Sequence, residues 1–83
     1  MKYDVTLSIK QLNKVRRAIK SLNDVRKELE VNNPENYINW YLEDNNNLNL
    51  MCDYSHSQDA HGVSNQDAVI RCFELDNAGG GGW

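Results

Sequence analysis

The spacing of apolar residues changes twice along this chain, and these changes limit the folds that it can adopt. From Tyr3 to Ile9, apolar residues alternate with polar ones, which is the period of a half-buried strand. A helical spacing follows and lasts to the segment before Pro34, after which the alternation returns. We therefore expect a strand, one long helix and then further strands.

The helix has a predictable start and end. Ser8 and Gln11 have the spacing of a capping box, so the helix is expected to begin near Ile9. It is expected to end at 30–32, because Pro34 disfavours helical geometry in the residue before it. Its apolar residues form one stripe: Leu12, Val15, Ile19, Leu22 and Leu29, widened by Ala18 and Val25. Such a stripe predicts one core-facing side.

Three strands are expected after the proline. Residues 37–43 and 48–54 alternate between apolar and polar, and the polar segment 43–47 between them is typical of a hairpin loop. Residues 55–66 are polar and predict a loop. Residues 68–76 are expected to form the last strand, with Ile70 and Cys72 on one face and Val69, Phe73 and Leu75 on the other. A strand that is apolar on both faces is usually central or covered.

These elements predict an α+β domain over residues 1–76 with the order β-α-β-β-β. One amphipathic helix would pack on a four-stranded, mostly antiparallel sheet, since 83 residues suit a single core. The far side of this sheet is expected to expose an apolar patch: Tyr37, Tyr41, Met51 and Phe73. Such a patch predicts a homodimer interface or a ligand surface, unless a loop or the tail covers it.

The charges are divided along the sequence. Residues 10–27 hold seven Lys and Arg and one acid, whereas residues 28–83 hold ten acids and the single base Arg71. On a helical projection, five bases lie opposite or beside the apolar stripe: Lys10, Lys14, Arg16, Arg17 and Lys20. The like-charge pairs Lys10–Lys14 and Arg16–Lys20 each cost a few tenths of a kcal/mol, roughly, so this arrangement favours a surface for phosphates or an acidic protein. The alternative is a solvated face balanced by acids of 43–47 or 55–66.

The acidic half of the chain and its end supply two further candidate surfaces. The acids selected as partner-binding are Glu43, Asp44, Asp53 and Asp59, which together would imitate phosphate charge against a basic channel. Residues 77–83 contain four consecutive glycines before Trp83 and predict a flexible tail. Trp83 would anchor the tail in a partner pocket, fold back onto the sheet, or have no role.

Two cysteines and two histidines offer the only candidate metal ligands, and the expectation for metal and cofactor is none. The four are Cys52, His56, His61 and Cys72, and they would suit zinc if the last two strands paired. Their spacing matches no closed zinc finger, and strand cysteines are usually small buried hydrophobes. A Cys–His nucleophile would also need an oxyanion site, and no glycine-rich turn lies near Cys52. No catalytic residues are therefore assigned.

The hypothesis that these features favour is a small, non-catalytic binding protein that occupies a surface of a larger protein or nucleoprotein complex. Inhibitors and anti-defence proteins of mobile elements share this size and charge character, which is an analogy only. One alternative is a nucleic-acid-binding module that uses the basic helix, although five bases on a net-acidic chain predict weak binding. Another is a small-ligand sponge or zinc protein. The first residues lack a signal-peptide pattern and no apolar run would span a bilayer, so a cytoplasmic protein is expected.

Overall fold

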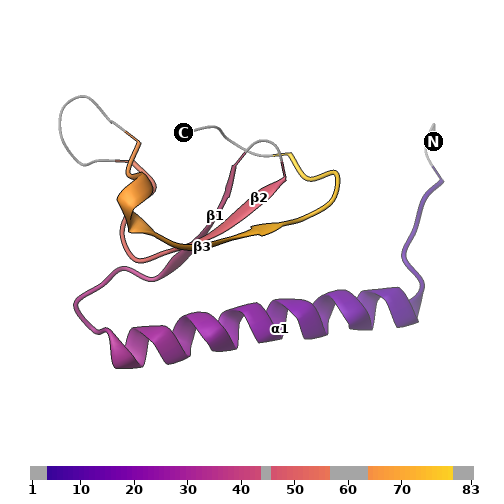
Figure 1. Cartoon of the computed structure of the whole chain (residues 1–83). Coiled ribbons are helices and arrows are strands. Elements are labelled where there is room, and N and C mark those ends of the chain that lie inside the picture. The colour runs from indigo at the N-terminus through magenta and orange to yellow at the C-terminus, as the bar shows by residue number, and fades with distance from the viewer. Residues whose placement is uncertain (1–3, 44–45, 57–63, 80–83) are drawn as a thin grey trace.

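The computed structural model describes residues 4–43, 46–56 and 64–79, which form one helix beside an antiparallel sheet (Figure 1). The elements are α1 (Ile9–Asn32), β1 (Asn39–Glu43), β2 (Asn47–Met51), the 3-10 turn η1 (Gln66–Ala68) and β3 (Val69–Glu74). The sheet has the order β1-β2-β3. The predicted α+β class is confirmed, with three strands in the described part of the chain.

Helix α1 begins where the sequence predicts. The Ser8 side chain accepts a hydrogen bond from the Gln11 backbone N–H at 3.1 Å, and the Gln11 side chain accepts one from the Ser8 N–H at 3.0 Å. This reciprocal capping box satisfies two backbone donors that the first turn leaves free. At the other end, the Asn33 amide donates to the Leu29 carbonyl at 2.9 Å, one residue before Pro34. The sequence therefore determines both ends of this helix.

The predicted first strand over residues 3–9 is wrong for its described part. Residues 4–8 have no strand structure, and Ile9 already belongs to α1. Val5 is 93% exposed and Leu7 is 60% exposed, so no sheet edge lies against this segment. Alternation gives a segment a strand-like surface, but the strand forms only if a neighbouring edge accepts its hydrogen bonds. The predicted four-stranded count is therefore not met within the described chain.

The two sheet ladders differ in regularity. The β1–β2 hairpin pairs Trp40 with Leu50 and Leu42 with Leu48. At the hairpin turn, Asn46 has a φ of 69°, in the left-handed region that asparagine tolerates better than most residues. The β2–β3 ladder shifts register between Leu50 and Met51. Leu50 pairs with Arg71 and Met51 pairs with Val69, so Ile70 is the extra residue of a bulge.

The bulge reverses the predicted faces of the last strand. Phe73 pairs with Leu48, and its ring centroid lies 6.2 Å from that of Trp40, on the side of the sheet that faces α1. Cys72 pairs with Asn49 and points to the opposite side. The sequence-based assignment had placed Cys72 inward and Phe73 outward. An extra residue within one strand changes the alternation of every residue after it, which explains the error.

The core lies within the sheet and the segment that follows β2, rather than beneath the helix. The buried apolar residues of the described chain are Ile38, Leu50, Met51 and Ala68. No residue of α1 is buried, although the helix contains 24 residues. Trp40 and Ile38 connect the sheet to the second half of the helix: the Trp40 Nε1 donates to the Leu22 carbonyl, and an Arg26 Nη1 donates to the Ile38 carbonyl. Helix and sheet are therefore joined by a thin contact layer.

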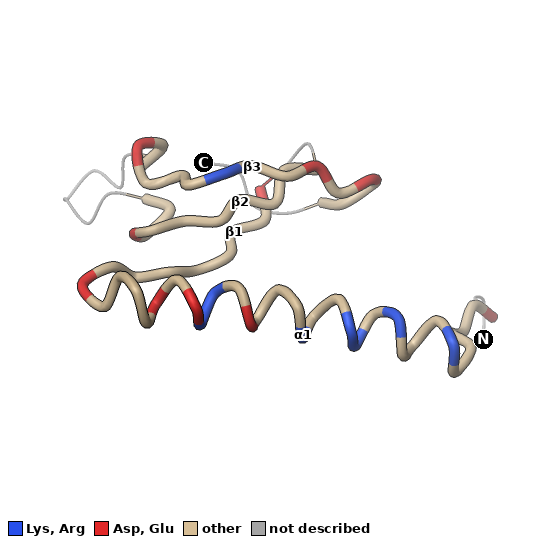
Figure 2. Tube along the Cα trace, turned by 60° about the horizontal axis from the view of Figure 1, so that its bottom comes forward, with Lys and Arg blue, Asp and Glu red and all other residues tan. Residues whose placement is uncertain are grey.

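The first half of α1 extends past the sheet, as Figures 1 and 2 both show. A 24-residue helix is about 36 Å long, whereas a six-residue strand spans about 20 Å. The sheet is thus too short to cover the whole stripe. Within the part of the chain described here, no helix is long and apolar enough to span a membrane.

Candidate binding site on the helix

The first half of α1 presents a basic outer face. Figure 2 shows Lys and Arg along this half and acids concentrated in the second half and in the sheet layer. All five predicted bases are exposed to solvent: Lys10, Lys14, Arg16, Arg17 and Lys20. No acid occupies the first turn, where a carboxylate would interact favourably with the helix dipole. The observed structure thus keeps the bases together on one accessible surface.

The second half of α1 neutralises its own bases. The Lys20 Nζ lies 2.8 Å from an Asp24 carboxylate oxygen, and Arg26 forms an ion pair with Glu30. The hydrogen bond from Asp24, with its negative charge, raises the pKa of Lys20 above its usual value of 10.5. Both pairs are spaced i,i+4 on the helix surface and are partly exposed, so they stabilise the helix only modestly. Lys20 therefore belongs to the boundary between the paired and unpaired halves.

The remaining four bases lack such neutralisation. Within residues 4–43, 46–56 and 64–79, Lys10, Lys14, Arg16 and Arg17 make no ion pair. Glu43, one acid expected to balance them, instead accepts hydrogen bonds from the side-chain amides of Asn47 and Asn49, each at 3.2 Å. The balancing acids expected at 44–45 and at Asp59 lie outside the described residues. The basic face is therefore unbalanced by the acids that the structure describes.

The four acids selected from the sequence do not form one described surface. Glu43 ends β1 beside the hairpin turn, whereas Asp53 follows β2 at the opposite end of the hairpin. Asp53 is exposed, and its carboxylate accepts a hydrogen bond from the Tyr54 N–H at 2.8 Å. Asp44 and Asp59 lie outside the described residues, as does the proposed tail anchor Trp83. Glu43 has a structural role in orienting the amide of the buried Asn49.

The predicted apolar face of the sheet is not assembled as one surface. Met51 is fully buried, and Phe73 lies on the side facing α1. Tyr37 precedes β1 and stacks against Tyr54 with ring centroids 4.7 Å apart. Tyr41 is half-buried and meets the ring of His56 edge-on at 6.2 Å. The segment after β2 thus covers part of the surface that the sequence suggested for dimerisation.

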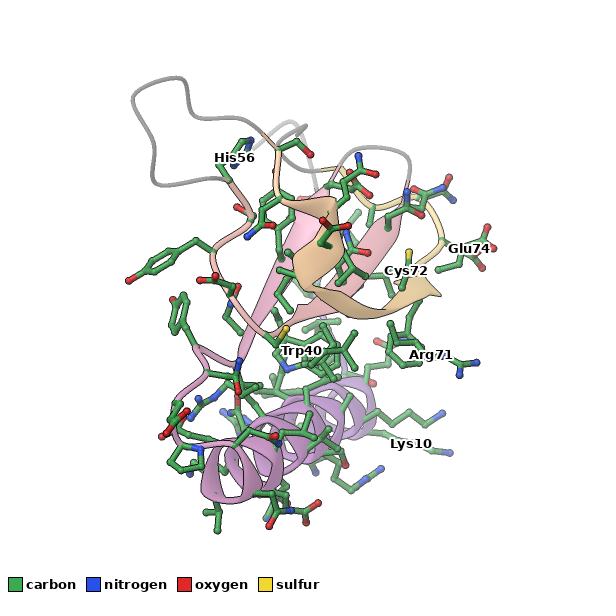
Figure 3. All side chains as sticks on the ribbon, turned by 60° about the vertical axis from the view of Figure 1, so that its left-hand side comes forward. Lys10, Trp40, His56, Arg71, Cys72 and Glu74 are labelled. Atoms are coloured by element: carbon green, nitrogen blue, oxygen red, sulfur yellow. The ribbon has the colours of Figure 1, made fainter. Side chains whose placement is uncertain are left out.

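The cysteines and histidines are separated rather than gathered. Figure 3 shows Cys72 on the side of β3 away from the helix. Cys52 follows β2, and its N–H donates to the Ala68 carbonyl at 2.8 Å. The two cysteines line different cavities: Cys72 borders one with Glu43 and Gln66, and Cys52 borders another with Leu29 and Ile38. The His56 ring contacts Ser55 at 3.1 Å, and His61 lies outside the described residues. No group of three potential metal ligands occurs among the residues that the structure places.

Two small cavities border the end of α1. One has a volume of about 310 Å³ and is lined mainly by apolar side chains, among them Leu29, Ile38 and Ile70. The other has a volume of about 230 Å³ and is more polar, with Asp53 and Asp67 in its wall. Both are open rather than enclosed. Neither contains a nucleophile beside a base, so neither provides the geometry of covalent catalysis.

The sequence interpretation missed that the helix stripe is itself a surface. Val15 is 49% exposed and Ile19 is 51% exposed, and Ile9 is more exposed still. These residues were expected to contribute to the core. The sequence did contain a usable signal, because the predicted helix was much longer than any of the predicted strands.

The chain was compared with family models, curated proteins and solved structures, and none of the three comparisons finds a match.

Proposed function

We propose that this protein is a small, non-catalytic binding protein that occupies an acidic surface of a larger protein through the basic face of α1. The observation that carries the proposal is the exposure of Lys10, Lys14, Arg16 and Arg17 without ion pairs among the described residues. Their mutual repulsion opposes helix formation, and an acidic partner would remove this cost. Such a protein would act by blocking the surface that it covers, as an inhibitor does.

An acidic protein surface suits this face better than duplex nucleic acid does. Four or five bases on one helix make few phosphate contacts, and few contacts give weak, salt-sensitive binding. The whole chain has a net charge of −3, and the sheet layer carries acids such as Glu74 and Asp76. These acids would repel a phosphate backbone wherever it passed the sheet. A protein partner presents a limited acidic patch and avoids this repulsion.

The experiment is an affinity capture with the full chain as bait, from lysate with and without nuclease treatment. Arg17→Glu reverses one charge in the unpaired half, and Lys27→Glu makes the same change on the same helix outside it. We expect capture of a defined protein that survives nuclease and is lost with Arg17→Glu but retained with Lys27→Glu.

Two results would contradict this function. Equal capture by the two charge-reversed variants would show that the basic face is not the site. Loss of the captured material on nuclease treatment would transfer the basic face to the nucleic-acid-binding alternative, which a salt titration with DNA and RNA would then test.

A further inference from the structure

Residues 4–8 form an unpartnered element with the surface of a β-strand. Val5 and Leu7 alternate with polar residues, and both apolar side chains are more than half exposed. The capping box at Ser8 begins α1 immediately afterwards, so this segment leaves the helix at a defined point. An exposed apolar segment of this kind is costly in water and gains free energy by joining a sheet edge.

The same chain offers an open edge that fits this segment. In the described chain, β3 pairs only with β2, and its other edge has no strand neighbour. Three large apolar residues at or next to this edge strand remain about half exposed: Ile70 at 47%, Phe73 at 44% and Leu75 at 48%. The residues of β1 at the other edge are each half-buried. The edge at β3 is therefore the one that still has apolar surface to bury.

The exposed stripe of α1 lies next to this segment. Ile9, Val15 and Ile19 follow residues 4–8 directly along the chain, and no described residue covers them fully. The first half of α1 and the end of β3 lie at the same end of the molecule in Figures 1 and 2. One chain thus carries a strand-like segment with an exposed helix stripe, and also an open sheet edge with exposed apolar residues.

The charges favour helix-on-sheet over helix-on-helix pairing between two copies. Antiparallel contact between two stripes would bring both basic halves together, each with Lys10, Lys14, Arg16 and Arg17. Contact with the β3 end of another copy would place that half near Glu74 and Asp76 instead. Like charges brought together raise the free energy of the complex, whereas opposite charges lower it.

We propose that two copies of this chain form a dimer in which residues 4–8 of each copy add to the free edge of β3 in the other. The first half of α1 follows, and its stripe covers Phe73 and Leu75 of the second copy. Because each copy gives and receives the same segment, the interface is closed and two-fold symmetric. The dimer supplies the fourth strand that the alternation of residues 3–9 predicts. The outward basic face of α1 stays on the surface.

The first test is the molar mass of the full chain in solution, measured by light scattering across a concentration series. Leu7→Asp places a carboxylate on the apolar side of the segment, and Thr6→Asp places one on its polar side. Both positions are exposed in the single chain, so neither change disturbs its own packing. We expect the mass of two chains for the unmodified protein and for Thr6→Asp, and a twofold lower mass for Leu7→Asp. A single-chain mass at every concentration, or a Leu7→Asp variant that stays paired, would overturn the proposal.

The second test identifies the contact itself by NMR on a mixture of isotope-labelled and unlabelled chains. Contacts between the methyl groups of Val5 or Leu7 in one copy and the Phe73 ring of the other are expected. If these contacts occur only within one chain, residues 4–8 complete their own sheet and the exchange is disproved. If the only contacts between copies join two α1 stripes, the interface is a different one. The Arg17→Glu variant should remain a dimer, which separates this test from that of the proposed function.

Discussion

The indole Nε1 of Trp40 donates a hydrogen bond to the backbone carbonyl of Leu22 at 3.2 Å, and this bond joins β1 to the middle of α1. Figure 3 shows Trp40 between the sheet and the helix. One turn further along, Arg26 donates to the Ile38 carbonyl at 3.4 Å. Both contacts lie in the second half of α1. The sheet therefore holds one half of the helix, and the other half is exposed to partners.

Trp40→Phe is expected to weaken this junction while keeping an aromatic ring in place. Loss of the indole donor should lower the free energy of unfolding by about 1 kcal/mol, with a further small loss of packed area. Urea denaturation followed by circular dichroism measures the change. Tyr37→Phe is the control, because its ring lies against Tyr54 and away from α1. An unchanged denaturation midpoint in Trp40→Phe would show that the indole bond does not hold helix and sheet together.

Glu43→Ala is expected to destabilise the sheet through Asn49. The Asn49 side chain is 99% buried, and its amide donates to the Glu43 carboxylate. Removal of the carboxylate leaves a buried donor unpaired, which costs about 1–3 kcal/mol. Glu43→Gln keeps one acceptor oxygen and should retain part of the stability. Glu74→Ala removes an exposed carboxylate from β3 and should change the unfolding free energy much less; equal losses in Glu43→Ala and Glu74→Ala would refute this role.

Asp24→Asn is expected to return the pKa of Lys20 toward its usual value. The hydrogen bond and the charge of Asp24 raise this pKa in the folded chain. A raised lysine pKa stabilises the fold below the unfolded-state value, and this contribution disappears as the pH rises through the folded-state pKa. The pair therefore stabilises the helix at neutral pH and not in strong alkali. An NMR titration of the Lys20 side chain in both proteins measures the shift, and identical titration curves would disprove the coupling.

Much of the local structure was predictable because its causes lie close together in the sequence. Ser8 and Gln11 are three residues apart and determine the start of α1, and Asn33 and Pro34 end it. The β1–β2 hairpin was predicted for the same reason, although the strands are shorter than expected. The exposure of Lys10 and Lys14 also follows from helical spacing alone. Their binding role remains a proposal.

The errors concern contacts between residues that are distant in sequence. The bulge at Ile70 depends on how β3 pairs with β2, and this pairing moved Phe73 to the helix side and Cys72 away from it. Residues 4–8 have the alternation of a strand, but no described edge accepts them. Strand formation needs a partner, and the sequence pattern does not say where that partner is.

The sequence by itself determined the helix, its ends, the order of the later strands and the concentration of positive charge in the first half of α1. These properties follow from backbone geometry and from interactions within a few residues. Only the tertiary structure decided which face of β3 meets the helix and how little of the apolar stripe the sheet covers. Those outcomes depend on the relative lengths and register of separate elements, because a side chain is buried only where another element reaches it.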